Sequence, residues 1–142
     1  MKHSLLTIIL ILLTATSTAT IREVHILSIN DMHAAFDRFP QFATLAASLR
    51  QLYPDILILS AGDNRTGNPY NDLAAVPSRP MVELKNKTGF SYTALGNHEF
   101  DGGIDRLRET INNSWFKYLY TNIIAPDSMR LNIEQITQTE RG

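Results

Sequence analysis

The sequence predicts a layered α/β fold, in which helices flank a sheet whose strands are at least partly parallel. Segments rich in β-branched and apolar residues alternate with segments of helical periodicity, in the order strand, helix, strand, helix, strand, helix, strand. In addition, a short polar cluster directly follows each of the first three strands. Ligands of parallel sheets bind beyond the carboxyl ends of the strands, so the clusters and the alternation support the same fold.

The first half of the chain supplies two predicted strands and the helix between them. Residues 23–29 are rich in β-branched and apolar side chains and predict a strand. Over residues 39–52 the apolar positions recur at helical spacing, and Pro54 closes this helix. The uninterrupted apolar run over 56–59 is typical of a strand that is covered on both faces.

The second half begins with a loop and then returns to the same alternation. Residues 64–77 are dense in Gly, Asn and Pro and predict a loop. A short helix is expected from Ser78, as its N-cap, to Gly89. The remaining predicted elements are strands over 91–95 and 117–123, a helix around 104–111 and one further strand over 131–136.

Residues 1–19 are predicted to be a cleaved export signal. A positively charged start precedes an unbroken apolar run over 5–13, and a tract of small residues follows. The run is too short to span a bilayer comfortably, since ~20 apolar residues are needed. We therefore expect export to the periplasm, the cell surface or the exterior, no stable membrane span after cleavage, and a single domain within 20–142. A retained N-terminal anchor is the alternative.

Charge and cysteine content narrow the classes of function. The formal net charge of the 142 residues is −1 and no basic block occurs, which argues against a nucleic-acid partner. The chain has no cysteine, so an exported form must be held together by core packing or by bound metal.

The polar clusters after the strands contain residue types that bind metals. Asp31 and His33 stand two apart, so in extended backbone their side chains reach the same side. Asp63 follows Gly62, which permits close approach of the backbone, and its two carboxylate oxygens can bridge two cations. Asn97 offers a neutral carbonyl oxygen. Mixed oxygen and imidazole ligands suit two divalent metal ions of the Mn, Zn, Fe or Co type without selecting one.

Each cluster also has an ordinary structural interpretation. Asp-x-His occurs by chance in many loops, and Gly-Asp after a strand is common turn chemistry. Asn97-His98-Glu99 also fits the start of a helix, where acidic residues favour the helix dipole. The functional interpretation depends on the occurrence of all three clusters, in this order, at three strand ends.

Three short motifs resemble those of a known family: Asp31-x-His33, Gly62-Asp63-Asn64 and Gly96-Asn97-His98-Glu99. They are similar to the motifs of calcineurin-like metallophosphoesterases. The longer matches over 28–33, 62–69 and 96–101 resemble the secreted 5'-nucleotidase branch, and the resemblance runs from about residue 24 to residue 123. It implies a metallophosphoesterase-type fold, here incomplete.

The resemblance also implies a two-metal phosphoester hydrolase acting on a small-molecule phosphoester, above all a nucleotide. Asp31 and His33 would hold the first metal, Asp63 would bridge, and Asn97 would bind the second. Such a metal pair shares an activated water and stabilises the attacking and leaving oxygens.

Two further residues receive catalytic roles through the same resemblance. His98 is not expected to be a ligand, and would stabilise the transition state or protonate the leaving oxygen. Asp101, three residues on, would orient its imidazole. For Glu99 the resemblance implies a structural role.

The sequence also departs from the family pattern. The family completes its metal site with later histidines, whereas this chain has none after His98. Residues 20–142 are therefore expected to be the N-terminal part of a metallophosphoesterase domain, with little or no activity unless a C-terminal segment or a second chain completes the site. A phosphodiesterase or nucleotide-sugar hydrolase with the same metal pair is one alternative. A non-catalytic fragment that binds metal weakly or not at all is the other.

Overall fold

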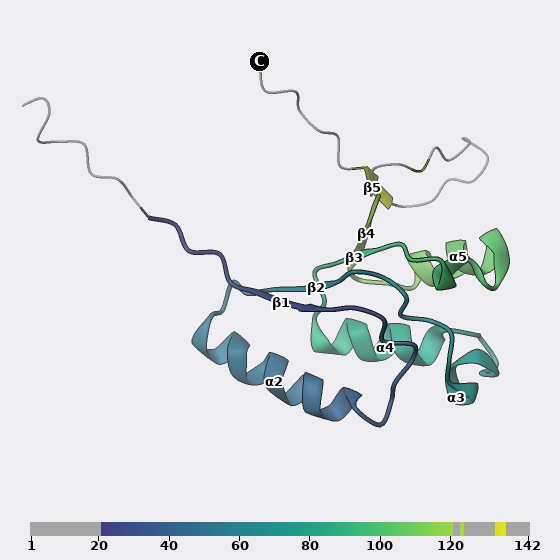
Figure 1. Cartoon of the computed structure of the whole chain (residues 1–142), viewed down its shortest axis with the longest axis horizontal. Coiled ribbons are helices and arrows are strands. Elements are labelled where there is room, and N and C mark those ends of the chain that lie inside the picture. The colour runs from purple at the N-terminus through teal and green to yellow at the C-terminus, as the bar shows by residue number, and fades with distance from the viewer. Residues whose placement is uncertain (1–20, 121–122, 124–132, 136–142) are drawn as a thin grey trace, which may run out of the picture.

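The computed structural model describes residues 21–120, 123 and 133–135, and within them five strands form one parallel sheet. Each strand pairs with the next in the chain, so the spatial order follows the sequence (Figure 1). The strands are β1 (Ile26–Ile29), β2 (Leu57–Ser60), β3 (Tyr92–Ala94), β4 (Lys117–Tyr120) and β5 (Ile133–Gln135). The α/β fold that the sequence predicts is confirmed.

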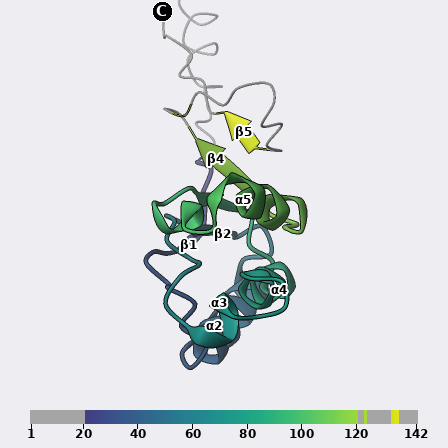
Figure 2. The ribbon, with the colours of Figure 1, turned by 90° about the vertical axis from the view of Figure 1, so that its right-hand side faces the viewer.

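Helices occupy the connections between the parallel strands, which cannot be joined by tight hairpins. The main ones are α2 (Phe39–Leu52), α4 (Arg79–Thr88) and α5 (Gly103–Asn112). Figures 1 and 2 show α2 and α4 side by side beneath β1 and β2. Two short helices, α3 (Pro69–Asp72) and the 3₁₀ helix η1 (His98–Phe100), lie in the loops.

The core lies between the sheet and these helices. Ser60, Thr93 and Tyr118 are register neighbours on adjacent strands, and all three are buried. The apolar core residues, which come from both layers, are Ala34, Phe39, Ala46, Ile58, Met81, Phe90, Leu107, Ile111, Phe116 and Tyr118. These contacts hold the strand ends in fixed relative positions.

The sequence predicts a strand over 56–59 that is covered on both faces, and within the described residues this prediction is wrong. Ile58 is fully buried against the helices, whereas Leu57 and Leu59, which point to the other face, are only partly buried. The alternation arises because the described helices of the core pack on one face of the sheet.

Two local predictions differ from the structure near the middle of the chain. The loop predicted over 64–77 contains α3, because the Asn68 side chain accepts a hydrogen bond from the Tyr70 backbone N–H at 3.0 Å and so caps one turn. Ser78 precedes α4 but makes no side-chain cap: its φ is 73°, and its buried hydroxyl has no partner among the described residues. Gly89 ends α4, as predicted, and it adopts the left-handed conformation there.

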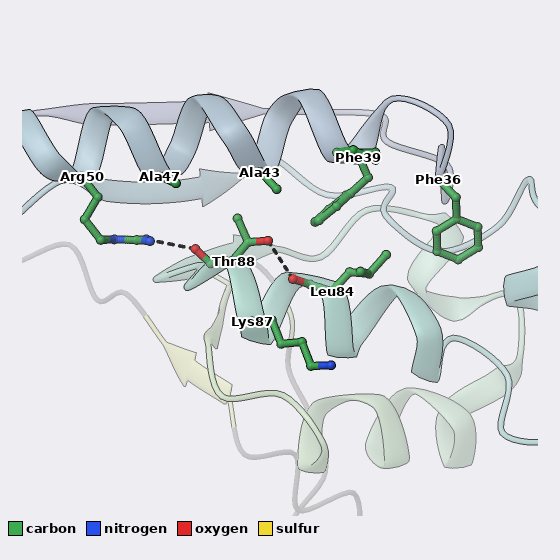
Figure 3. Close-up of a pocket in the computed structure, with 9 residues that line it drawn as sticks. Phe36, Phe39, Ala43, Ala47, Arg50, Leu84, Lys87 and Thr88 are labelled. Carbon is green, nitrogen blue, oxygen red and sulfur yellow. Dashed lines mark hydrogen bonds between the residues drawn. The ribbon is translucent and has the colours of Figure 1, made fainter.

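A groove of about 430 Å³ runs between α2 and α4 (Figure 3). Its apolar walls come from Phe39 and Ala43 on one side and Leu84 on the other. Arg50 closes one end by donating a hydrogen bond of 3.0 Å to the Thr88 carbonyl. None of the candidate site residues lines this groove.

The predicted export signal over 1–19 lies outside the described residues and stays a prediction. Among the helices that the structure describes, none combines the length and the hydropathy needed to cross a bilayer.

Candidate metal centre

Backbone pairing continues beyond the ends of β1 and β2 and brings the first two polar clusters together. The Asp31 N–H donates to the Gly62 carbonyl at 3.3 Å, and the His33 N–H donates to the Asp63 carbonyl at 3.0 Å. The next bond runs from the Ala34 N–H to the Asn64 carbonyl at 3.0 Å. The loop after β1 is therefore bound along its length to the loop after β2.

This pairing produces a compact group of metal-ligating side chains. Asp31, His33 and Asp63 each offer one ligand atom, and these atoms all lie within 4.8 Å of one another. The Nε2 atom of His33 is 3.9 Å from Oδ1 of Asp31. The two residues of the first loop are largely accessible, with side chains 60 % and 39 % exposed for Asp31 and His33, so a cation and water can reach them.

The ring of His33 is oriented by a backbone carbonyl. Its Nδ1 lies 2.8 Å from the Thr66 carbonyl oxygen. Because a carbonyl only accepts, Nδ1 carries a proton, and Nε2, which points toward the carboxylate of Asp31, is the ring nitrogen that a metal could bind. Thr66 could not be identified from the sequence, because a backbone carbonyl has no signature in residue type.

The residues of this group have an unusual backbone conformation. The φ angles of Asp31, His33 and Asp63 are 49°, 45° and 52°, in the left-handed region that non-glycine residues rarely adopt. The sequence-based argument assumes extended backbone between Asp31 and His33. The structure instead turns the chain at both residues, and their side chains still converge because the backbone bonds to the second loop fix them. Such strained residues gather at functional sites.

The polar cluster after β3 contacts the polar cluster after β2 through Asp63. The Oδ1 atom of Asp63 accepts a hydrogen bond of 2.9 Å from the His98 backbone N–H. Gly96 packs so closely on Asp63 that a Cβ at this position would overlap its carboxylate. Asn97, which is exposed, stands between these two contact residues. The backbone of Asn97 is thereby held next to Asp63.

His98 and Asp101 form a pair beside the ligand group. Their Nδ1 and Oδ2 atoms are 2.8 Å apart, and the rings of His98 and His33 meet edge to face with centroids 4.8 Å apart. The hydrogen bond to Asp101 is the main cause that raises the pKa of His98. Hydrogen bonds to Thr66 and then to His98 hold the pKa of Asp101 below its usual range.

The structure therefore brings Asp31, His33, Asp63, His98 and Asp101 to one edge of the sheet, with the backbone of Asn97 beside them. Carboxylates and an imidazole that is oriented through its other ring nitrogen fit a divalent first-row cation. Fold and site together define an α/β protein with a candidate metal centre at the carboxyl ends of its strands.

The comparisons with known proteins identify the family. The profile of the calcineurin-like phosphoesterase family matches residues 24–136, and the chain belongs to this family.

Individual relatives and structures agree with this membership. The chain is 30% identical to a snake venom 5'-nucleotidase of Gloydius brevicauda over 78% of its length, which is 21% of that protein. It is 25% identical to a 2',3'-cyclic-nucleotide 2'-phosphodiesterase/3'-nucleotidase of Yersinia enterocolitica, covering 85% of this chain and 22% of that one. The structure of the NAD nucleotidase of Haemophilus influenzae superposes with a TM-score of 0.67 at 28% identity, over 76% of this chain and 22% of that protein. The chain thus spans about a fifth of the length of the proteins it resembles.

Proposed function

We propose that this chain is the N-terminal part of an exported two-metal phosphoester hydrolase of the 5'-nucleotidase type. The observation that carries the proposal is the convergence of Asp31, His33 and Asp63 within 4.8 Å, next to the hydrogen-bonded pair of His98 and Asp101. Family membership supports the reaction class, phosphoester hydrolysis.

In this proposal four residues hold two divalent cations. Asp31 and His33 hold the first divalent cation, Asp63 contributes to both positions, and Asn97 binds the second. Bound cations supply charge stabilisation to a phosphoryl group and lower the pKa of coordinated water. Asp63 is suited to the shared position because its backbone carbonyl accepts from the His33 N–H and its Oδ1 accepts from the His98 N–H, which fixes it between the first and third loops.

His98 acts on the substrate rather than on metal. With its Nδ1 bound to Asp101, its other ring nitrogen, Nε2, can donate a proton to the leaving oxygen. The raised pKa favours the imidazolium that this role requires. Asp101 keeps the ring oriented and compensates the positive charge.

The substrate class follows from the relatives. Two of them bear the names of nucleotidases that differ in the ester position, and one of these is also a cyclic-nucleotide phosphodiesterase. We therefore propose nucleoside monophosphates as substrates, with a nucleotide phosphodiester as the second candidate. The named Yersinia enterocolitica relative is the observation that favours the second.

The test measures cation binding and hydrolysis in the same preparations. Mn²⁺ binding to the full chain is followed by calorimetry, and phosphate release from AMP, 3'-AMP and 2',3'-cyclic AMP is assayed with Mn²⁺ in excess. Asp63→Asn should weaken Mn²⁺ binding by about 10-fold or more, because it removes a ligand charge and an acceptor. His98→Asn should leave Mn²⁺ binding close to wild type and abolish any turnover.

Asp105→Asn is the matched control, since Asp105 is an exposed carboxylate on α5 whose contact with Arg108 lies within the same helix. It should match the wild type in both assays. If the folded wild-type chain binds no more Mn²⁺ than Asp63→Asn does, the proposal is wrong and the non-catalytic fragment is the better description.

A further inference from the structure

One buried carboxylate connects the second and third loops of the candidate metal centre. Glu99 is 3 % exposed, and its Oε2 accepts hydrogen bonds from the backbone N–H groups of Asp63 at 3.0 Å and Gly96 at 2.7 Å. Its Oε1 accepts from the backbone N–H of Asn64 at 2.8 Å and from the Asn64 side chain at 3.1 Å. A single anion thus binds three backbone amides from two loops that follow different strands.

The Asn64 side chain extends this connection into the sheet. Its Oδ1 accepts from the Ser60 hydroxyl at 2.6 Å, and its Nδ2 donates to the Thr93 hydroxyl at 3.2 Å. Ser60 lies at the end of β2 and Thr93 lies in β3, and both are buried. Both loops are therefore fixed to the strands that precede them.

A buried lysine lies beneath this network. Lys85 of α4 is 2 % exposed, and its Nζ is 3.4 Å from the Thr93 hydroxyl. It also sits over the rings of Phe90 and Phe116, at 4.8 and 4.4 Å from their centroids. The network therefore contains a buried carboxyl group and a buried amine, and Thr93 and Asn64 bridge between them.

We propose that Glu99 is a positioning residue that fixes the distance between Asp63 and Asn97, and with it the spacing of the two cation positions. The proposal rests on the function proposed for this site. Its basis is that the amides bound by Glu99 belong to Asp63 itself and to Gly96, the residue before Asn97. Glu99 thus acts through the second and third loops, to which these hydrogen bonds run.

A merely structural role for Glu99 makes a different prediction. In that case its loss would lower the melting temperature and leave cation binding unchanged in the folded protein. Glu99→Gln separates the two roles, because its amide NH₂ then faces N–H donors, either those of Asn64 or those of Asp63 and Gly96, and part of the connection between the loops is lost. Outer residues that orient metal ligands typically contribute about 10- to 100-fold to affinity.

The experiment is a Mn²⁺ titration of the full chain, followed by calorimetry and by electron paramagnetic resonance, at a temperature where each variant is folded. For Glu99→Gln we expect at least a roughly tenfold weaker affinity, together with loss of any spin coupling between two Mn²⁺ ions that the wild type shows. Leu107→Ala, which removes a fully buried side chain of α5 outside the network, is the control for lost stability. It should lower the melting temperature and keep the wild-type affinity.

Asn64→Ala is the second variant, in case Glu99→Gln does not fold. It keeps the backbone amide on Glu99 but removes the connection to Ser60 and Thr93, so a smaller loss of affinity, about three- to tenfold, is expected. Wild-type affinity and coupling in whichever of the two variants folds would overturn the positioning role while the proposed function stands. Absence of Mn²⁺ binding in the wild type would instead overturn the proposed function.

Discussion

Neighbouring residues of the segment 98–101 serve opposite sides of the candidate metal centre. Glu99 points into the interior, where it is 3 % exposed and binds three backbone amides. His98 and Asp101 lie on the accessible side, with side chains 35 % and 40 % exposed, and bind each other. The 3₁₀ geometry of η1 makes this division possible, because its three residues per turn place positions 98 and 101 on the same side.

One short segment therefore holds the loops in place and also carries the candidate catalytic pair. Buried polar groups such as Glu99 and Lys85 are costly to leave without hydrogen-bond partners, so they favour one arrangement of the loops. Exposed groups such as His98 and Asp101 are weakly constrained and remain free to exchange protons with substrate or solvent. The substitutions below affect first the buried and the exposed residues of the candidate metal centre together, then the buried residues, and then the exposed ones.

The largest effect is expected from Gly96→Ala. A Cβ at Gly96 would overlap the carboxylate and the backbone nitrogen of Asp63, and its φ lies outside the left-handed region, so the damage is steric. Overpacking of this kind typically costs about 1–3 kcal/mol of unfolding free energy. Because the displaced residue is a candidate ligand, Mn²⁺ affinity should fall by about 100-fold. Denaturant unfolding and calorimetry measure the two quantities.

Gly103→Ala provides the matched control for this substitution. Gly103 has a φ of 75°, and a Cβ added there would meet no atom within 4 Å, so alanine brings backbone strain without touching the site. The strain should cost about 1–2 kcal/mol of unfolding free energy and leave the Mn²⁺ affinity unchanged. Equal loss of affinity in the two variants would mean that Gly96 matters only for stability.

The next prediction concerns Lys85 and the pH dependence of the unfolding free energy. Burial lowers the pKa of Lys85 to about 7, against an ordinary value of 10.5, with the Glu99 carboxylate opposing the shift. Between these two values the unfolded chain binds more protons than the folded chain, so stability rises with pH. We expect the unfolding free energy of the wild type to rise above about pH 7 by up to ~1.4 kcal/mol per pH unit relative to Lys85→Met.

The measurement is urea unfolding of both proteins from about pH 7 to about pH 9.5, below the range where tyrosines titrate. The Lys85→Met curve should be flatter across this window. Parallel curves for the two proteins would show that Lys85 stays charged in the folded state. Lys85 and Glu99 would then act as an ion pair rather than as two groups joined through Thr93 and Asn64.

Much of the site could be predicted from the sequence, because strand ends in a parallel sheet meet at one edge. Asp31, Asp63 and His98 follow three successive strands, so the strand order alone brings them close together. The family resemblance likewise implies that Asp101 orients His98, and the structure shows a hydrogen bond between the two side chains. Their catalytic and ligand roles stay predictions.

The contacts of Lys85 and Glu99 could not be predicted from the sequence. Lys85 belongs to a helical segment in which a lysine normally indicates a solvated face, and its burial depends on Thr93 and two aromatic rings from other elements. The bonds of Glu99 run to backbone amides, which nearly every residue carries. β1 is likewise shorter than predicted, because its register with β2 starts at the pair of Ile26 and Leu57.

The smallest effect, on the exposed side, is expected from Asp101→Asn. The hydrogen bond that His98 donates to Asp101 is the main cause of the raised pKa of His98, while the carboxylates of Asp63 and Glu99 add smaller attractions. An amide keeps a hydrogen-bond acceptor but removes the charge, so the pKa of His98 should fall. NMR titration of the His98 ring in metal-free protein measures this directly, and Asp105→Asn should leave it unchanged. If the pKa of His98 does not fall, the buried Glu99 and the candidate ligand Asp63 stabilise its protonated form, and the buried and exposed residues of the segment 98–101 act less independently than their contacts indicate.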